Sequence, residues 1–129
     1  MRAMAAASLF LAACAAAPPS PGAGDPAGPA AQAGQVLGRF ATAVRNDRLD
    51  EAWPLLSARW RARSTPATLA ADLAASARVG RESAERVQAL LAAGRLPVVD
   101  GDRATLAVGE GKAARLLLEA GEWRVDALE

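Results

Sequence analysis

The sequence lacks histidine and tyrosine, contains one cysteine, and nearly balances fifteen basic against fourteen acidic residues. These absences exclude a Ser–His–Asp triad, a histidine metal site, a tyrosine oxyanion donor and an internal disulfide. The formal charge of +1 argues against nucleic acid as a partner. The sequence also has no glycine-rich phosphate loop, metal-ligand spacing or nucleophile elbow. We therefore expect no cofactor, no metal site and no enzymatic activity.

The 129 residues suffice for one domain and are too few for two ordinary ones. Apolar residues make up 52% of the chain, but 35 residues are alanine, so large core side chains are limited in number. Composition divides the chain into an apolar start (1–13), an Ala/Pro/Gly-rich part (14–34) and a charged remainder (35–129). We expect these to be an export signal, a disordered tether and one folded domain.

The first part ends in Leu11-Ala12-Ala13-Cys14, after an apolar run of 11 residues at positions 3–13. Such a run is about half of the ~20 residues that span a bilayer. The four residues resemble the lipobox of bacterial lipoproteins. This resemblance implies cleavage before Cys14 and acylation of that cysteine, which makes Cys14 a lipidation site. The alternative is an ordinary signal peptide that is cut after an alanine and leaves a free thiol.

The residue after the cysteine, Ala15, bears on location. In Gram-negative relatives of the lipoprotein class, aspartate at this position favours retention at the inner membrane. This chain has alanine there, which is compatible with transfer to the outer membrane. The resemblance thus implies a lipid-anchored protein of the bacterial cell envelope, on the periplasmic face of the outer membrane. Residues 15–34 offer little apolar surface to bury, so a chain that begins near residue 35 is expected to fold equally well.

Helical periodicity begins at residue 35. The pattern predicts a helix over 35–46, with Leu37, Phe40 and Val44 on one face. A second helix is predicted with Asp50 as its N-cap and Trp53, Leu56 and Trp60 on one face. Thr65 and Pro66 predict a third helix start, as cap and first helical residue. A fourth helix is predicted over 81–93, and Gly94 would end it.

After residue 95 the spacing of apolar residues changes from the helical period to the alternation typical of strands. Runs over 96–99, 103–108, 113–119 and 122–127 are separated by glycine-containing hairpin turns. Ala104, Leu106 and Val108 alternate with polar or small residues, and Trp123 shares a face with Val125. The sequence therefore predicts an α+β domain, in which N-terminal helices pack on a C-terminal four-stranded antiparallel sheet.

Two segments carry a family resemblance. The first lies within residues 40–57 and contains Phe40-Ala-Thr-Ala-Val44, then Asn46-Asp47 and then Ala52-Trp53-Pro-Leu-Leu-Ser57. The second is Gly121-Glu-Trp-Arg-Val-Asp126 near the end. The arrangement resembles the nuclear transport factor 2-like, or cystatin-like, superfamily. This resemblance implies a curved sheet that wraps a helix, together with a cone-shaped pocket. Some members are isomerases or cyclases and many are binding modules, but this chain lacks the Tyr and His that commonly complete their acid–base sites.

Two carboxylates are candidates for general-base chemistry, Asp72 on a helix and Asp126 in the last strand. An apolar pocket could raise the pKa of either one. The alternative is a solvated Asp72 and an Asp126 that pairs with a nearby arginine, which we favour because most carboxylates lie at the surface.

Basic and aromatic residues give two further candidates. Arg59 and Arg63 share a helix face with Arg61 nearby, and could contact lipid phosphates or an anionic wall polymer. The alternative is a basic last turn favoured by the helix dipole. Trp53 and Trp60 could line a ligand pocket, although core packing is the favoured interpretation.

Three functions remain open on the sequence. The leading hypothesis is a lipid-anchored envelope protein whose small non-catalytic domain binds a small apolar ligand or an envelope protein. The second is a ketosteroid isomerase- or cyclase-like enzyme that uses an aspartate. The third is a structural accessory of the envelope.

Overall fold

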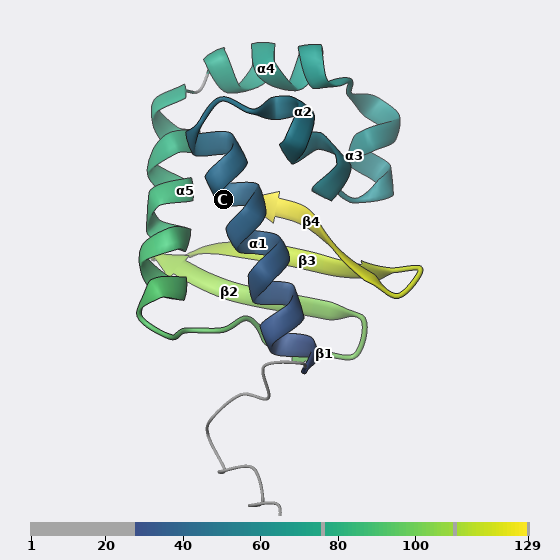
Figure 1. Cartoon of the computed structure of the whole chain (residues 1–129), viewed down its shortest axis with the longest axis vertical. Coiled ribbons are helices and arrows are strands. Elements are labelled where there is room, and N and C mark those ends of the chain that lie inside the picture. The colour runs from purple at the N-terminus through teal and green to yellow at the C-terminus, as the bar shows by residue number, and fades with distance from the viewer. Residues whose placement is uncertain (1–27, 76, 110, 129) are drawn as a thin grey trace, which may run out of the picture.

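The computed structural model describes residues 28–75, 77–109 and 111–128, and shows an α+β fold. The segments 1–13 and 14–27, with Cys14, lie outside the described residues. Helices precede strands along the described chain, in the order α1 (Pro29–Arg45), α2 (Leu49–Ala52), η1 (Trp53–Leu55), α3 (Ala58–Arg63), α4 (Pro66–Ala75), α5 (Ala77–Ala92), β1 (Val98–Asp100), β2 (Arg103–Gly109), β3 (Lys112–Glu119) and β4 (Glu122–Leu128). Figure 1 shows α1 crossing one face of the sheet with α5 beside it, and α4 at the end of the molecule away from β1.

The four strands form one antiparallel sheet in the order β1-β2-β3-β4, so the predicted meander is confirmed. The alternation predicted for β2 is also confirmed, since Ala104, Leu106 and Val108 are buried and the residues between them are exposed. The first strand starts at Val98, later than predicted. Helices cover one sheet face, and the other face is open.

The core lies between α1, α5 and the covered sheet face. Trp123 and Val125 are buried, as their predicted shared face requires. The larger buried side chains of this core are Leu37, Phe40, Val44, Leu56, Val87, Leu106, Val108, Leu116, Trp123 and Val125.

Helix α1 begins at Pro29, so the predicted helix start at residue 35 is wrong. Gly28 is the N-cap and Pro29 takes the first helical position, where a missing N–H costs least. Ala33 and Gly34 are buried. A Cβ at Gly34 would lie 3.3 Å from Leu96 Cδ2, so only a residue without a side chain fits without adjustment. Small residues thus give this turn its close packing, which composition alone had assigned to a tether.

The second predicted helix is divided into α2, η1 and α3. The chain is extended at Leu56 and Ser57, with ψ of 154° and 158°. Leu56 forms a parallel bridge with Val125, and the Ser57 N–H donates to the Val125 carbonyl over 2.8 Å. Pairing with the β4 edge therefore overrides the helical pattern. Asp50 lies inside the first turn of α2 and Arg48 takes the N-cap position, so the predicted cap is also wrong.

The start of α4 follows its sequence signals. The Thr68 N–H donates to Thr65 Oγ1 over 3.2 Å, and the helix begins at Pro66, so the predicted cap is confirmed. At the end of α5, Gly94 has a φ of 85°, which glycine adopts without the strain that a side chain would add. The Arg95 N–H donates back to the Leu90 carbonyl over 3.0 Å.

Candidate functional site

Asp126, one of the two predicted acid–base candidates, is held by an arginine and a serine. Arg59 donates to both carboxylate oxygens, from Nε to Oδ1 over 2.6 Å and from Nη2 to Oδ2 over 2.7 Å. Ser57 Oγ also donates to Oδ1 over 2.7 Å, and the serine is fully buried. The predicted pairing of Asp126 with an arginine is therefore confirmed. A guanidinium fork stabilises the charged carboxylate and occupies the oxygens that a general base would use.

Glu119 completes this polar cluster at the start of α3. Its carboxylate accepts the Ala58 N–H over 3.0 Å, and Arg61 Nη2 lies 4.0 Å from Glu119 Oε1. The Ser57 hydroxyl, which would ordinarily cap this helix, donates to Asp126 instead. The cluster therefore fastens α3 to the ends of β3 and β4.

Asp72 lies elsewhere in the molecule. It is exposed on α4, which packs against α2 and α5, whereas Asp126 belongs to β4. The two predicted carboxylates therefore lie on different parts of the fold.

The three arginines of α3 do not form one basic face. Arg59 pairs with Asp126, and Arg61 Nε donates to the Leu56 carbonyl over 3.0 Å. Arg63 is exposed and has no hydrogen bond or ion pair within the described residues. Arg61 and Arg63 lie in the last turn, where the helix dipole favours cations.

The two tryptophans differ in burial. Trp53 is half-buried against the core, and its Nε1 donates to the Ser64 carbonyl over 3.1 Å. Trp60 is 43% exposed, so its predicted place in the core is wrong. The break at Ser57 separates Trp60 from the face of Trp53, and its indole N–H donates to the Asp126 carbonyl. Arg59 Cζ lies 5.8 Å from the Trp60 ring centroid, within cation–π range.

A groove of about 720 Å³ lies along α1, between α2, η1 and α5. We call it the α1 groove. Its apolar surface comes from Gly38, Ala43, Leu55 and Leu91, and its polar lining is Arg39, Thr42, Asn46, Arg48, Glu51 and Gln88. A volume of this size suits a small ligand, and mixed apolar and polar lining is typical of ligand sites.

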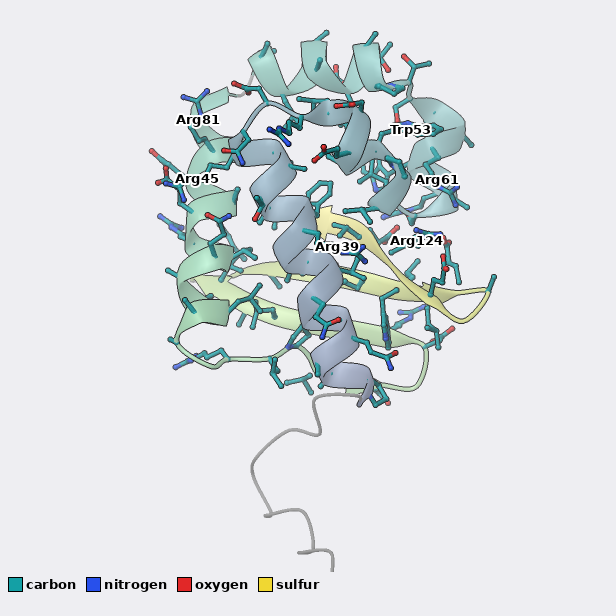
Figure 2. The ribbon with its side chains drawn as sticks, viewed as in Figure 1. Arg39, Arg45, Trp53, Arg61, Arg81 and Arg124 are labelled. Atoms are coloured by element: carbon teal, nitrogen blue, oxygen red, sulfur yellow. The ribbon has the colours of Figure 1, made fainter. Side chains whose placement is uncertain are left out.

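Gln88 orders one wall of the α1 groove. Its Nε2 donates to Thr42 Oγ1 and its Oε1 accepts from Arg45 Nη1, both over 2.9 Å. Arg45 lies toward α5, whereas Arg39 lies on the other side of α1 (Figure 2). Arg39 has no hydrogen bond or ion pair among the described residues, and Arg48 contacts Glu51 at 3.5 Å. The groove thus offers one uncommitted guanidinium beside an apolar floor.

The α1 groove is not predicted by the sequence. Its lining comes from three stretches, 38–48, 51–55 and 88–91, and none carries a motif. Gly38 and Ala43 give little signal, because they are two of several small residues on α1. Small residues leave space only where neighbouring helices border them, and the sequence does not show which helices do.

Comparisons add no relative: no family model, no curated protein and no solved structure matches this chain. Among the described residues, no helix is long and apolar enough to cross a membrane. The same part of the chain contains no group of three or more metal-ligating side chains placed to hold an ion.

Proposed function

We propose that this protein is a bacterial lipoprotein, acylated at Cys14, whose folded domain is a non-catalytic ligand-binding module of the cell envelope. The lipobox-like residues 11–14 support the anchor. The α1 groove supports the binding role, because it combines a volume of about 720 Å³ with Arg39, which has no hydrogen bond or ion pair among the described residues. The membrane is then a partner through the lipid, and the ligand is a small molecule with an apolar body.

The contacts of Asp126 favour this function over an aspartate-dependent isomerase or cyclase. Its carboxylate oxygens accept hydrogen bonds from Arg59 and from the buried Ser57. A base in such an enzyme would need a free oxygen near the substrate and a raised pKa. We also propose that this α+β domain has the nuclear transport factor 2-like fold. The position of α1 across one face of the sheet supports this proposal.

In that superfamily the expected pocket lies between the sheet and its helix. Here the inward side chains Leu106, Leu116 and Val125 are buried in the core with Leu37 and Phe40 of α1. We therefore place the ligand in the α1 groove, on the side of the helix layer.

Intact-mass measurement tests the anchor. Protein extracted from membranes should begin at Cys14 and carry acyl mass, and Cys14→Ser should abolish that mass and release the protein. Mature soluble protein with an unmodified thiol would reject the lipoprotein assignment.

Calorimetric titration with laurate tests the groove, since this probe joins an apolar chain to one carboxylate. Gly38→Leu should fill the groove, because a Cβ added at this position would lie 3.5 Å from Leu91 Cδ1, and binding should fall at least about tenfold. Arg39→Gln should weaken laurate more than dodecyltrimethylammonium, which lacks the anionic head. Arg63→Gln is the matched control, as it removes an equally unpaired charge outside the groove. Equal binding in all variants would contradict the site.

Two carboxamide variants test the enzymatic alternative. If binding is the function, Asp72→Asn and Asp126→Asn should leave laurate affinity within about twofold, because neither residue lines the α1 groove. Any turnover found for the protein and abolished by either variant would instead favour the aspartate enzyme.

A further inference from the structure

The open face of the sheet carries two arginines that lack partners. Arg103 on β2 and Arg115 on β3 are exposed on the face away from α1. Neither side chain has a hydrogen bond or an ion pair within the described part of the chain. This contrasts with Arg59, which lines the same region and is paired with Asp126.

Strand register brings the two arginines together. Thr105 lies directly opposite Arg115, and Arg103 lies directly opposite Leu117. Arg103 and Arg115 are therefore diagonal neighbours on one face, about 7–8 Å apart at Cα and within reach of long side chains. Two like charges at this separation repel unless an anion lies between them.

A hollow of about 410 Å³ lies at this place. Its lining includes Arg59, Arg103, Thr105, Arg115 and Asp126, that is, three guanidinium groups against one carboxylate. The Asp126 carboxylate already accepts from Arg59 and from the buried Ser57. The charge of Asp126 is therefore balanced by Arg59. The two unpaired arginines give the hollow a net positive charge.

One more carboxylate is nearby. Asp100 of β1 lies opposite Arg103 in the strand register, yet the two side chains form no ion pair. The Arg103 guanidinium thus remains available on the side of Arg115.

We propose that this hollow is a binding site for a phosphate group. Guanidinium forks match the spacing of tetrahedral oxyanions and bind them through paired, charge-assisted hydrogen bonds. Thr105 lies two residues from Arg103 on β2 and directly opposite Arg115 on β3, and its hydroxyl adds a neutral donor. The open sheet face leaves room for the rest of a phosphate ester, which can be a soluble molecule or a lipid headgroup.

Titration of the ¹⁵N-labelled full chain with inorganic phosphate, at constant ionic strength set by chloride, tests the site. Saturable shifts are expected at the amides of Thr105 and Arg115. Arg103→Gln and Arg115→Gln should each weaken binding about tenfold, the effect expected for loss of a charge-assisted fork. Arg115→Lys should weaken it less, because the charge is kept and the fork is lost. Thermal unfolding of each variant confirms that the exposed substitutions leave the fold intact.

Arg63→Gln is the matched control, since Arg63 is exposed, equally unpaired and on α3. It should leave the phosphate affinity unchanged. Phosphate shifts that are unsaturable, or that fall equally with Arg63→Gln, would overturn the proposal.

Vesicles separate the two sources of phosphate. The Cys14→Ser full chain, which cannot be acylated, is sedimented with phosphatidylglycerol vesicles and with phosphatidylcholine vesicles. Sedimentation lost with Arg103→Gln identifies a lipid headgroup. Arginine-dependent binding of inorganic phosphate without sedimentation identifies a soluble phosphate. If neither probe depends on these two arginines, the site does not exist.

Discussion

Helices α1 and α4 are both rich in alanine and both begin with proline, but they differ in burial. Helix α1 buries seven residues, and α4 buries none. Large apolar residues recur along α1 at positions 37, 40 and 44, whereas α4 has only Leu69 and Leu73, which are half-buried. Alanine therefore favours the helix in both places, and larger neighbours at helical spacing decide which helix enters the core.

The positions of α1 and α4 in the fold add to this difference in burial. Helix α1 packs on β4, α2 and α5, and Figure 1 shows it across the sheet. Helix α4 contacts α2 and α5 at the far end, and a hollow of about 330 Å³ is lined by residues of α4 together with Val44 and Leu49. We therefore expect substitutions in the α1–sheet layer to reduce stability more than equivalent substitutions in α3 or α4.

The largest effect is expected for Trp123→Ala, on the sheet side of this layer. Trp123 is 4% exposed, and removal of a buried tryptophan should lower the free energy of unfolding by about 3–5 kcal/mol. Trp60→Ala is the matched control at 43% exposure and should cost less than about 1 kcal/mol. Urea titration measures both. A change below about 0.5 kcal/mol for Trp123→Ala would reject its place in the core.

Leu37→Ala and Leu73→Ala compare the two helices directly. Leu37 is fully buried, so its truncation should cost about 2–4 kcal/mol through lost burial and a new cavity. Leu73 lines the hollow beside α4, and its truncation should cost about 1 kcal/mol or less. Denaturant midpoints at an unchanged slope give the two values. Equal losses would show that α4 is docked as firmly as α1.

Truncation tests the newly found first turns of α1. A chain that begins at residue 35 loses the buried Ala33 and Gly34 and should unfold with about 1–2 kcal/mol less free energy than one that begins at residue 28. Thermal melts of the two chains measure the difference. Agreement within a degree would restore residue 35 as the energetic boundary of the domain.

The smallest chemical change in this comparison is alanine to glycine. Ala71→Gly on exposed α4 should cost at most about 1 kcal/mol, which is the helix-propensity difference alone. Ala41→Gly on α1 should cost about 2 kcal/mol, because it also removes a fully buried methyl group. Chemical denaturation of the pair separates propensity from burial. No effect at all of Ala71→Gly would indicate that α4 contributes nothing to the cooperative unfolding unit.

The sequence predicts the structure correctly where the pattern is local. The alternation of residues 103–108 and the turn at Asp100-Gly101 predict β1–β2 pairing because strand period and turn chemistry involve only near neighbours. The Thr65–Pro66 helix start is equally local. The same reasoning failed at Leu56 and Ser57, whose helical spacing was overridden by hydrogen bonding to Val125.

The site could be anticipated only in part. Pairing of Asp126 with an arginine was predicted, but its specific partners Arg59 and Ser57 lie 67 and 69 positions away in the chain. The α1 groove and the Arg103–Arg115 hollow also join separate stretches. No local pattern encodes such distances, since they depend on how the layers pack.

The sequence by itself determined the α+β class, the four-stranded meander, the buried face of β2 and the burial of Trp123. Each follows from the spacing of apolar residues, from the turn residues or from the scarcity of large apolar side chains, which leaves few ways to build a core. Tertiary structure alone decided that α1 starts at Pro29, that the chain extends at Ser57, and that Trp60 is exposed. At Ser57, pairing with a distant strand outweighs local helix propensity, which is worth only about 1 kcal/mol per residue, and the resulting break leaves Trp60 outside the core. At Pro29 local propensity also favours the helix, and the close packing of Ala33 and Gly34 includes this turn in the folded domain.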